Sequence, residues 1–144
     1  NVAKVTNMSH MFYNCNKLTN VNSIADWNVS NLIDIYSMFY NCTSLNNIEG
    51  LKNWNVSKVT DMGSLFYGCS SLSNIEPLRN WTVSNVTYLG NTFNRCTSLT
   101  NVNALENWNT AKVTSLYYTF NECRALTNVD GLLNWNVSNV TKIN

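Results

Sequence analysis

The fold of this chain is decided by one stretch, WNVSKVTDMGSLFYGCSSLSNI at residues 54–75, because its pattern returns throughout the sequence. Tryptophan, phenylalanine and cysteine each recur every 27 residues without a slip. The three series are Trp27, Trp54, Trp81, Trp108 and Trp135; Phe12, Phe39, Phe66, Phe93 and Phe120; and Cys15, Cys42, Cys69, Cys96 and Cys123. A fixed period of this length predicts a stack of similar coils rather than one folded-up globule.

Length and composition bound the architecture and the class of partner. The chain has 144 residues, which gives about five 27-residue coils in one continuous array. Hydrophobic residues make up 44%, enough for a core, and nine Lys and Arg nearly balance eight acids, so no nucleic-acid partner is expected. No apolar run is long enough to cross a bilayer, so no direct membrane insertion is expected. Both ends of 1–144 fall inside a repeat, and we expect an uncapped segment of a longer protein.

The spacing of apolar residues within one repeat predicts its secondary structure. The first four apolar positions are three, four and three residues apart, which is typical of a helix face. They are Val5, Met8, Phe12 and Cys15 in the first copy. We therefore expect a helix of two to three turns near 6–15 and at each equivalent span. The next apolar positions step by threes, which favours a chain that turns corners, with a short strand near 18–22 and a second candidate strand near 27–29.

The cysteine series has three interpretations: a metal site, a disulfide ladder or buried free thiols. Zinc sites need closely spaced ligands such as a CxxC pair, and this sequence has none. Identical stacked coils point their Cβ atoms in parallel, which is poor disulfide geometry, and five cysteines leave one unpaired. We therefore expect small, buried, free thiols.

Two columns of amide side chains are expected to stabilise the turns. The amides of the first column can satisfy backbone groups of their own turn and of the next coil. This column is Asn20, Asn47, Asn74, Asn101 and Asn128. The second precedes each tryptophan and is expected to do the same at another corner: Asp26, Asn53, Asn80, Asn107 and Asn134. Ligand binding by these columns is the alternative.

The sequence carries no recognisable catalytic pattern. There is no Ser-His-acid arrangement, no acid pair at a defined spacing and no phosphate-binding glycine loop. His10 is the single histidine, and its column holds unrelated residues in the other repeats, so it should face solvent. We expect no catalytic residue, no metal and no cofactor.

Positions that vary from copy to copy are free for recognition, and two candidate surfaces follow. One is a polar, mildly acidic face beside the expected strand, suited to hydrogen bonding a partner or glycan. Its residues are Thr19, Asn46, Ser73, Thr100 and Thr127 beside Asn22, Glu49, Glu76, Asn103 and Asp130. The other is a row of Tyr13, Tyr40 and Tyr67 on the outer helix face, because exposed aromatic residues are typical of binding surfaces. Half-buried packing on neighbouring residues is the alternative for the tyrosines.

The pattern Trp-Asn-Val-Ser-x-Val-Thr-x-Met-x-x-x-Phe-x-x-Cys-x-x-Leu-x-x-Ile resembles the BspA-type leucine-rich repeat family, in particular the bacterial surface protein repeat known as DUF285. The copy at 54–73 matches this pattern best, and the resemblance covers the whole chain. It implies surface or secreted proteins of bacteria, some of which are adhesins, and it supplies no catalytic residues. Together with the periodicity it predicts a right-handed α/β leucine-rich-repeat-like solenoid of 27-residue coils, with one short parallel strand and one short helix per coil.

The expected function follows from the array and the resemblance. We expect a non-enzymatic, extracellular cell-surface segment that binds a protein or glycan of the host or of a neighbouring cell. The alternative is a structural spacer or assembly element of a surface layer or fibre, favoured by the uniform, weakly charged repeats. Self-association remains open under both interpretations.

Overall fold

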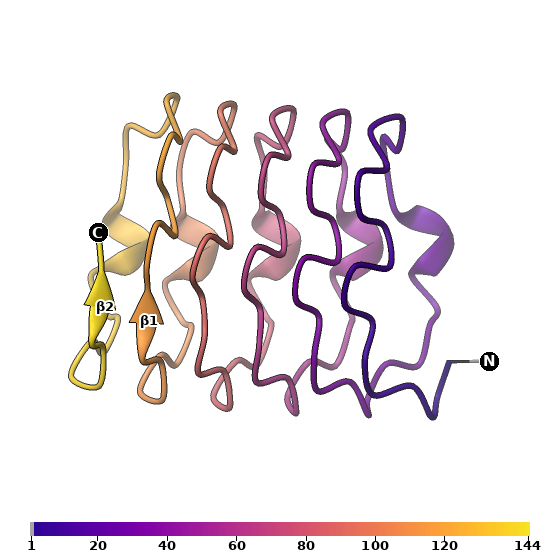
Figure 1. The fold of residues 1–144 in the computed structure, drawn as a ribbon, viewed down its shortest axis with the longest axis horizontal. Helices are drawn as coiled ribbons and strands as arrows, with labels where there is room; N and C mark the ends of the chain where they lie inside the picture. Colours follow the sequence, from indigo (N-terminus) through magenta and orange to yellow (C-terminus); the bar gives the residue numbers. More distant parts are fainter. Residues whose placement is uncertain (1) are drawn as a thin grey trace.

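The computed structural model describes residues 2–144 and shows a repeat fold in which similar turns of the chain lie side by side in a row (Figure 1). The first and last repeats of the described chain lie at opposite ends of this row. Parallel backbone bridges join residues 27 apart, beginning with Asn7 and Asp34. At the last repeats the bridges lengthen into two paired parallel strands, β1 (Ser115–Leu116) and β2 (Lys142–Ile143). Each repeat is therefore hydrogen-bonded to the next in a constant register.

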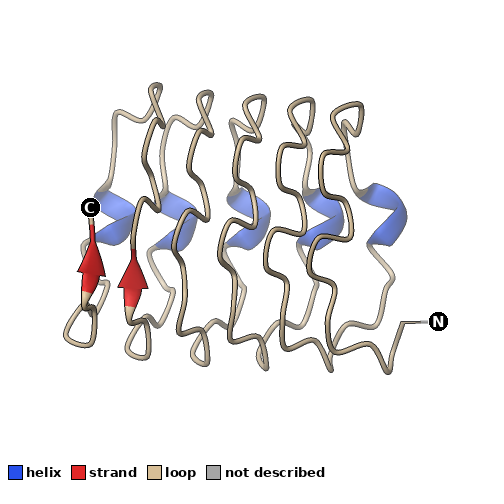
Figure 2. Ribbon diagram, viewed as in Figure 1, coloured by secondary structure: helices blue, strands red, loops and turns tan. Residues whose placement is uncertain are grey.

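Helical structure within residues 2–144 is limited to one three-residue 3-10 helix per repeat, on the far side of the row from β1 and β2 (Figure 2). These helices are η1 (Asn22–Ile24), η2 (Glu49–Leu51), η3 (Glu76–Leu78), η4 (Asn103–Leu105) and η5 (Asp130–Leu132). Helices of neighbouring repeats pack against each other, from η1 with η2 to η4 with η5. The last residue of η1 to η4 is buried and faces the core.

The helix predicted near 6–15 is wrong. In the equivalent part of the third repeat, the amides of Ser64 and Phe66 donate to the carbonyls of Gly90 and Thr92 in the next repeat, both at 2.9 Å. The residues between them close tight turns, in which a carbonyl accepts from the amide three residues on. Residues 6–15 and their equivalents in the other repeats, hereafter the ladder segment, therefore carry the main hydrogen bonds between repeats and contain no α-helix.

Two positions of this ladder segment have left-handed backbone, which an α-helix of L-residues excludes. The first position is occupied in successive repeats by His10, Ser37, Ser64, Asn91 and Tyr118. The second is occupied by Asn14, Asn41, Gly68, Arg95 and Glu122. The turns advance by four residues, so they still bring Met8 and Phe12 to the core side. A four-residue turn period and a helical period thus produce nearly the same apolar pattern.

The strand predicted near 18–22 is present only as single bridges, of which Asn20–Asn47 and Asn101–Asn128 form in residues 2–144. No strand forms near 27–29. The helical turn of each repeat begins at the end of this predicted strand, since η1 starts at Asn22. In the described residues the helical turn of each repeat thus follows the predicted strand and does not lie in the predicted helix.

The core is a continuous stack of repeated side chains. Phe39, Phe66 and Phe93 are fully buried, and their rings stack with centroids 5.6 and 5.8 Å apart. Each tryptophan side chain has one polar group, the indole N–H. In Trp81 the indole Nε1 donates to the carbonyl of Leu51 at 2.9 Å. The buried phenylalanine rings therefore pack copy upon copy, and the indole N–H is satisfied across the interface between repeats.

All five cysteines are free, and Cys42, Cys69 and Cys96 are buried, as the sequence predicts. Each of these thiols donates to a carbonyl in the preceding repeat, as in the bond of Cys69 Sγ to Phe39 O at 3.2 Å. Burial was overestimated at the ends of the row, where Cys15 is exposed and Cys123 is half-buried.

Replacing Gly68 by alanine is expected to lower the free energy of unfolding by about 1–2 kcal/mol, because Gly68 has a φ of +71°. A Cβ atom there would also lie 2.1 Å from Oδ1 of Asn41, which would have to move. Urea unfolding of the variant measures the loss, with Ser73→Ala as an exposed control in the same repeat. A Gly68→Ala protein as stable as the parent would show that this turn is not left-handed.

Candidate binding surfaces

All ten residues of the predicted polar face are exposed, and they form two parallel rows along the stack, hereafter the polar surface. The first row precedes the Asn20 column, and Asn46 in it is tied to Thr19 by a backbone hydrogen bond of 3.0 Å. The second row consists of the first residues of η1 to η5: Asn22, Glu49, Glu76, Asn103 and Asp130. The structure therefore brings these residues together in register, one pair per repeat.

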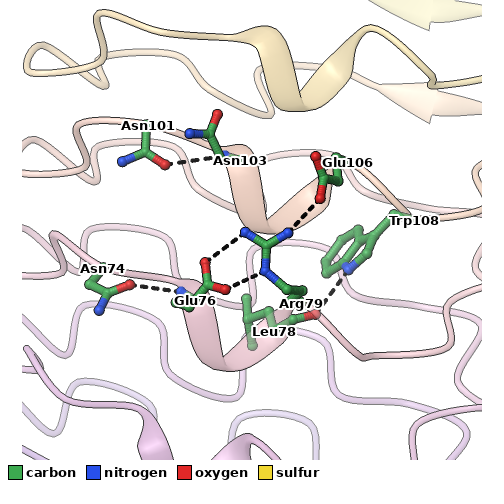
Figure 3. A network of polar contacts seen from close by, with 8 residues as sticks. All are labelled: Asn74, Glu76, Leu78, Arg79, Asn101, Asn103, Glu106 and Trp108. Carbon is green, nitrogen blue, oxygen red and sulfur yellow. Dashed lines mark hydrogen bonds and ion pairs between the residues drawn. The ribbon is translucent and has the colours of Figure 1, made fainter.

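The Asn20 column fixes the start of each 3-10 helix. Asn74 Oδ1 accepts from the amide of Glu76 at 2.8 Å, and Asn101 Oδ1 accepts from the amide of Asn103 at 3.2 Å (Figure 3). The other members make the same bond to the residue two positions on. This confirms the predicted bonding within the turn, and it orients the second row of the polar surface. The predicted amide bond to the next repeat does not form in residues 2–144.

The second predicted amide column is wrong as a turn-stabilising series. Its members, from Asp26 to Asn134, are exposed and make no side-chain hydrogen bond within the described part of the chain. The role belongs to the asparagine that follows four of the five tryptophans, whose Oδ1 accepts from the amide two residues on. These residues are Asn28, Asn55, Asn109 and Asn136. The recurring Trp-Asn pair was the signal that could have identified them.

Charge on the polar surface is uneven. Arg79 donates to Glu76 with two nitrogens, one bond measuring 3.0 Å, and to Glu106 of the next repeat at 2.6 Å (Figure 3). The hydrogen bonds from Arg79 hold the pKa of Glu76 below its ordinary value. The negative charge of Glu76 is thus compensated, and Glu49 and Asp130 form no ion pair within residues 2–144. A shallow cavity of about 300 Å³ lies beside Glu49, between the second and third repeats, and Asn46 and Asn74 line it.

The tyrosine row is stacked rather than open. Ring centroids of Tyr13 and Tyr40 are 4.7 Å apart, those of Tyr40 and Tyr67 are 4.4 Å apart, and the planes are nearly parallel. Tyr13 is 43% exposed, while Tyr40 and Tyr67 are half-buried and lie on the ladder segment, not on a helix. Burial raises the pKa of Tyr40, and the neighbouring Tyr67 raises it further. The row therefore presents ring edges to solvent, as the packing alternative describes, and binding by it stays a prediction.

The repeat also stacks acids that the sequence did not single out. Asp34 and Asp61 are directly bridged, and each Oδ1 accepts from the amide two residues on, Tyr36 and Gly63, at 2.8 Å. Burial, and to a lesser degree the neighbouring Asp34, raises the pKa of Asp61. The 27-residue period was a sufficient signal for this pair. Both carboxylates stabilise turns of the ladder segment.

The described part of the chain has no metal cluster, and its central thiols are buried. No group of three His, Cys, Asp or Glu side chains is placed to hold a metal ion in residues 2–144. Burial raises the pKa of Cys42 to about 11, so this thiol is protonated at neutral pH and is a weak nucleophile. His10 is exposed as predicted, and the centre of its ring lies 5.4 Å from the ring centres of both Tyr13 and Tyr36.

A larger apolar cavity of about 520 Å³ lies at the C-terminal end of the row, where the last repeat leaves the core open. Phe120, Trp135, Val137 and Ile143 line it. These residues occupy the columns of the core series in the last repeat, so the cavity is lined by core positions. The helices of residues 2–144 include none with the length and hydrophobicity of a membrane span.

Comparison with known proteins places these repeats in a family. The family model described as "Mycoplasma protein of unknown function, DUF285" matches residues 1–76 and 68–144. A comparison with curated proteins gives no match.

One solved structure shows the same kind of repeat fold. A leucine-rich cell surface protein of Faecalibacterium prausnitzii A2-165 is 25% identical with a TM-score of 0.57, over 87% of this chain and 29% of that one. A leucine-rich repeat protein of Bacteroides ovatus ATCC 8483 is 20% identical with a TM-score of 0.41, over 88% of this chain and 41% of that one. This chain thus spans less than half the length of either protein. Because the family model matches the chain from residue 1 to residue 144, the chain belongs to the DUF285 family and is a BspA-type leucine-rich repeat protein.

Proposed function

We propose that this chain is a non-enzymatic part of an extracellular cell-surface protein, in which it binds proteins or glycans of a host or a neighbouring cell. The repeats would form a right-handed solenoid of 27-residue coils that holds the binding residues in fixed rows. The cell-surface description of the Faecalibacterium protein supports the location.

One observation carries the binding proposal: ten polar side chains are exposed in two aligned rows, although their backbone is firmly held. The amide bonds of the Asn20 column and the stacked 3-10 helices fix the second row before any ligand arrives. Binding to such a preorganised surface costs less conformational entropy than binding to a mobile loop. The cavity beside Glu49 gives the rows a concave place where a ligand group can be seated.

Direct binding measurements test this proposal. The folded chain is expected to bind at least one member of a panel of matrix proteins, mucins and neutral glycans. Replacing Asn46 and Glu49 together by alanine should weaken that binding about tenfold or more, since both line the cavity. The matched control replaces Asn53 and Asn80, which are exposed polar residues without side-chain partners in residues 2–144.

The alternative is a spacer or assembly element, which the uniform repeats and the net charge of +1 favour. Sedimentation of the same protein distinguishes the two functions. Concentration-dependent association together with no binding to the panel would favour the spacer. Equal affinity of the Asn46/Glu49 variant and its control would remove the polar surface as the binding site.

A further inference from the structure

The three arginines of the chain differ in how far carboxylates neutralise them. Arg79 bonds to two glutamates, while Arg124 bonds to Glu122 at 2.6 Å through one nitrogen and keeps 74% of its side chain exposed. Arg95 forms no ion pair within residues 2–144. Its guanidinium carbon lies 5.8 Å from the centre of the Tyr67 ring, at the end of the tyrosine row. Arg95 is thus an uncompensated cation whose position is supported by an aromatic ring.

Arg95 and Arg124 line the same groove, which has a volume of about 460 Å³. It runs across the last four repeats, at the end of the ladder segment rather than on the polar surface. Gly68 lines its middle part, where the glycine leaves room for Oδ1 of Asn41. The groove therefore combines two guanidinium groups with the carboxylate of Glu122, which is paired with Arg124, so its lining carries a net charge of +1 and no large apolar side chain.

The remaining lining offers a row of hydrogen-bond acceptors. The hydroxyl of Ser70 donates to the carbonyl of Thr43, and the hydroxyl of Thr97 donates to the carbonyl of Ser70, both at 3.3 Å. Their protons are used within the protein, so the lone pairs of Ser70 Oγ and Thr97 Oγ1 remain for donors from a ligand. A ligand matching this groove carries an oxyanion for the guanidinium groups and several O–H donors for the acceptors.

We propose that this groove binds an acidic saccharide, whose carboxylate or sulfate lies between Arg95 and Arg124. The planar guanidinium donates two parallel hydrogen bonds to such an oxyanion, which gives orientation as well as affinity. The sugar hydroxyls donate to Ser70 and Thr97. This inference goes beyond the proposed function, because it assigns a ligand class to a second surface and does not require the polar surface.

Titration of the folded chain with defined saccharides tests the inference. Sialyllactose supplies a sugar carboxylate, a sulfated disaccharide supplies a sulfate, and lactose is the neutral comparison. We expect at least one acidic saccharide to bind about tenfold or more tightly than lactose, and added salt to weaken that binding. Whichever of the two acidic saccharides binds identifies the anionic group that the groove recognises.

Two variants locate the site. Arg95→Gln and Arg124→Gln should each weaken acidic-saccharide binding, with a loss of about tenfold or more for Arg95→Gln. Arg79→Gln is the matched control, because Arg79 is already paired with two glutamates elsewhere, and it should bind normally. The Asn46/Glu49 double alanine variant should also bind normally, which separates this groove from the polar surface.

Several results would overturn the inference. They are lactose binding as tightly as both acidic saccharides, full binding by Arg95→Gln, or an equal loss in Arg79→Gln. Inorganic sulfate binding as tightly as the sulfated disaccharide would show an adventitious ion only. Preference for an acidic peptide over both acidic saccharides would assign the groove to a protein partner instead.

Discussion

Replacing Phe66 by alanine is expected to lower the free energy of unfolding by about 3–5 kcal/mol, the usual cost of removing a buried aromatic side chain. Phe66 is fully buried and its ring stacks on Phe39 on one side and on Phe93 on the other. The truncation therefore opens a cavity at two interfaces between repeats at once. Since neighbouring interfaces supply most of the stability of a repeat array, the loss should disrupt the array at its centre.

Phe12→Ala is the matched control for this loss. Phe12 belongs to the same series, but it is half-buried at the N-terminal end and stacks on Phe39 alone, at 5.4 Å. Urea unfolding followed by tryptophan fluorescence should give a clearly smaller loss for Phe12→Ala than for Phe66→Ala. Equal losses would mean that the two phenylalanines do not differ in the number of repeats they contact.

Raising the pH above about 8.5, the ordinary pKa of a thiol, is expected to destabilise the protein progressively. Burial raises the pKa of Cys42 to about 11 and raises that of Cys69 further. Between the unfolded and folded pKa values the folded chain keeps thiol protons that the unfolded chain has lost. Stability from this source is thus fully present below pH 8.5 and is lost as the pH rises through the folded pKa values.

A cysteine variant isolates this effect from other alkaline titrations. Where a thiol is protonated in the folded state and ionised in the unfolded state, it contributes a slope of about 1.4 kcal/mol per pH unit. Urea unfolding between pH 9 and pH 10 should therefore show a shallower pH dependence for Cys69→Ala than for the parent chain. Ser73→Ala, which removes an exposed side chain that does not ionise, should keep the parent slope. Identical slopes in all three proteins would mean that Cys69 is not buried as a neutral thiol.

The stacking of repeats was predictable because identical residues at a fixed period pack best when each lies on its copy in the next repeat. The series of Phe66 and Cys69 had to lie copy upon copy once the period was recognised, and the ring stacking and thiol bonds agree. The same period, applied to charged residues, would also have paired Arg79 with Glu106 and Asp34 with Asp61. Exposure of the polar surface followed from the variability of its positions.

The local conformation of the ladder segment was not predictable from the apolar pattern. Ser64 and Tyr118 adopt left-handed backbone although nothing in these residue types favours it. Hydrogen bonds to the next repeat hold this conformation, and such bonds depend on neighbours far away in sequence. The available signal was the other left-handed column, where Asn14, Asn41 and Gly68 are residue types that tolerate it.

Which arginines are neutralised by carboxylates, and which share a groove, was also not predictable from the sequence. Arg95 and Arg124 are one repeat apart but in different columns, so the period alone does not show that they share a groove. The support of Arg95 by Tyr67 joins the third and fourth repeats and depends on how the tyrosine rings stack. These placements required the packed structure.

Direct detection of hydrogen bonds by NMR, through couplings between an amide nitrogen and the carbonyl carbon that accepts its proton, tests the ladder most directly. The account predicts couplings from the amides of Ser64 and Phe66 to the carbonyls of Gly90 and Thr92 in the next repeat. A coupling from Ser64 to the carbonyl four residues earlier, Thr60, would indicate an α-helix and contradict the account.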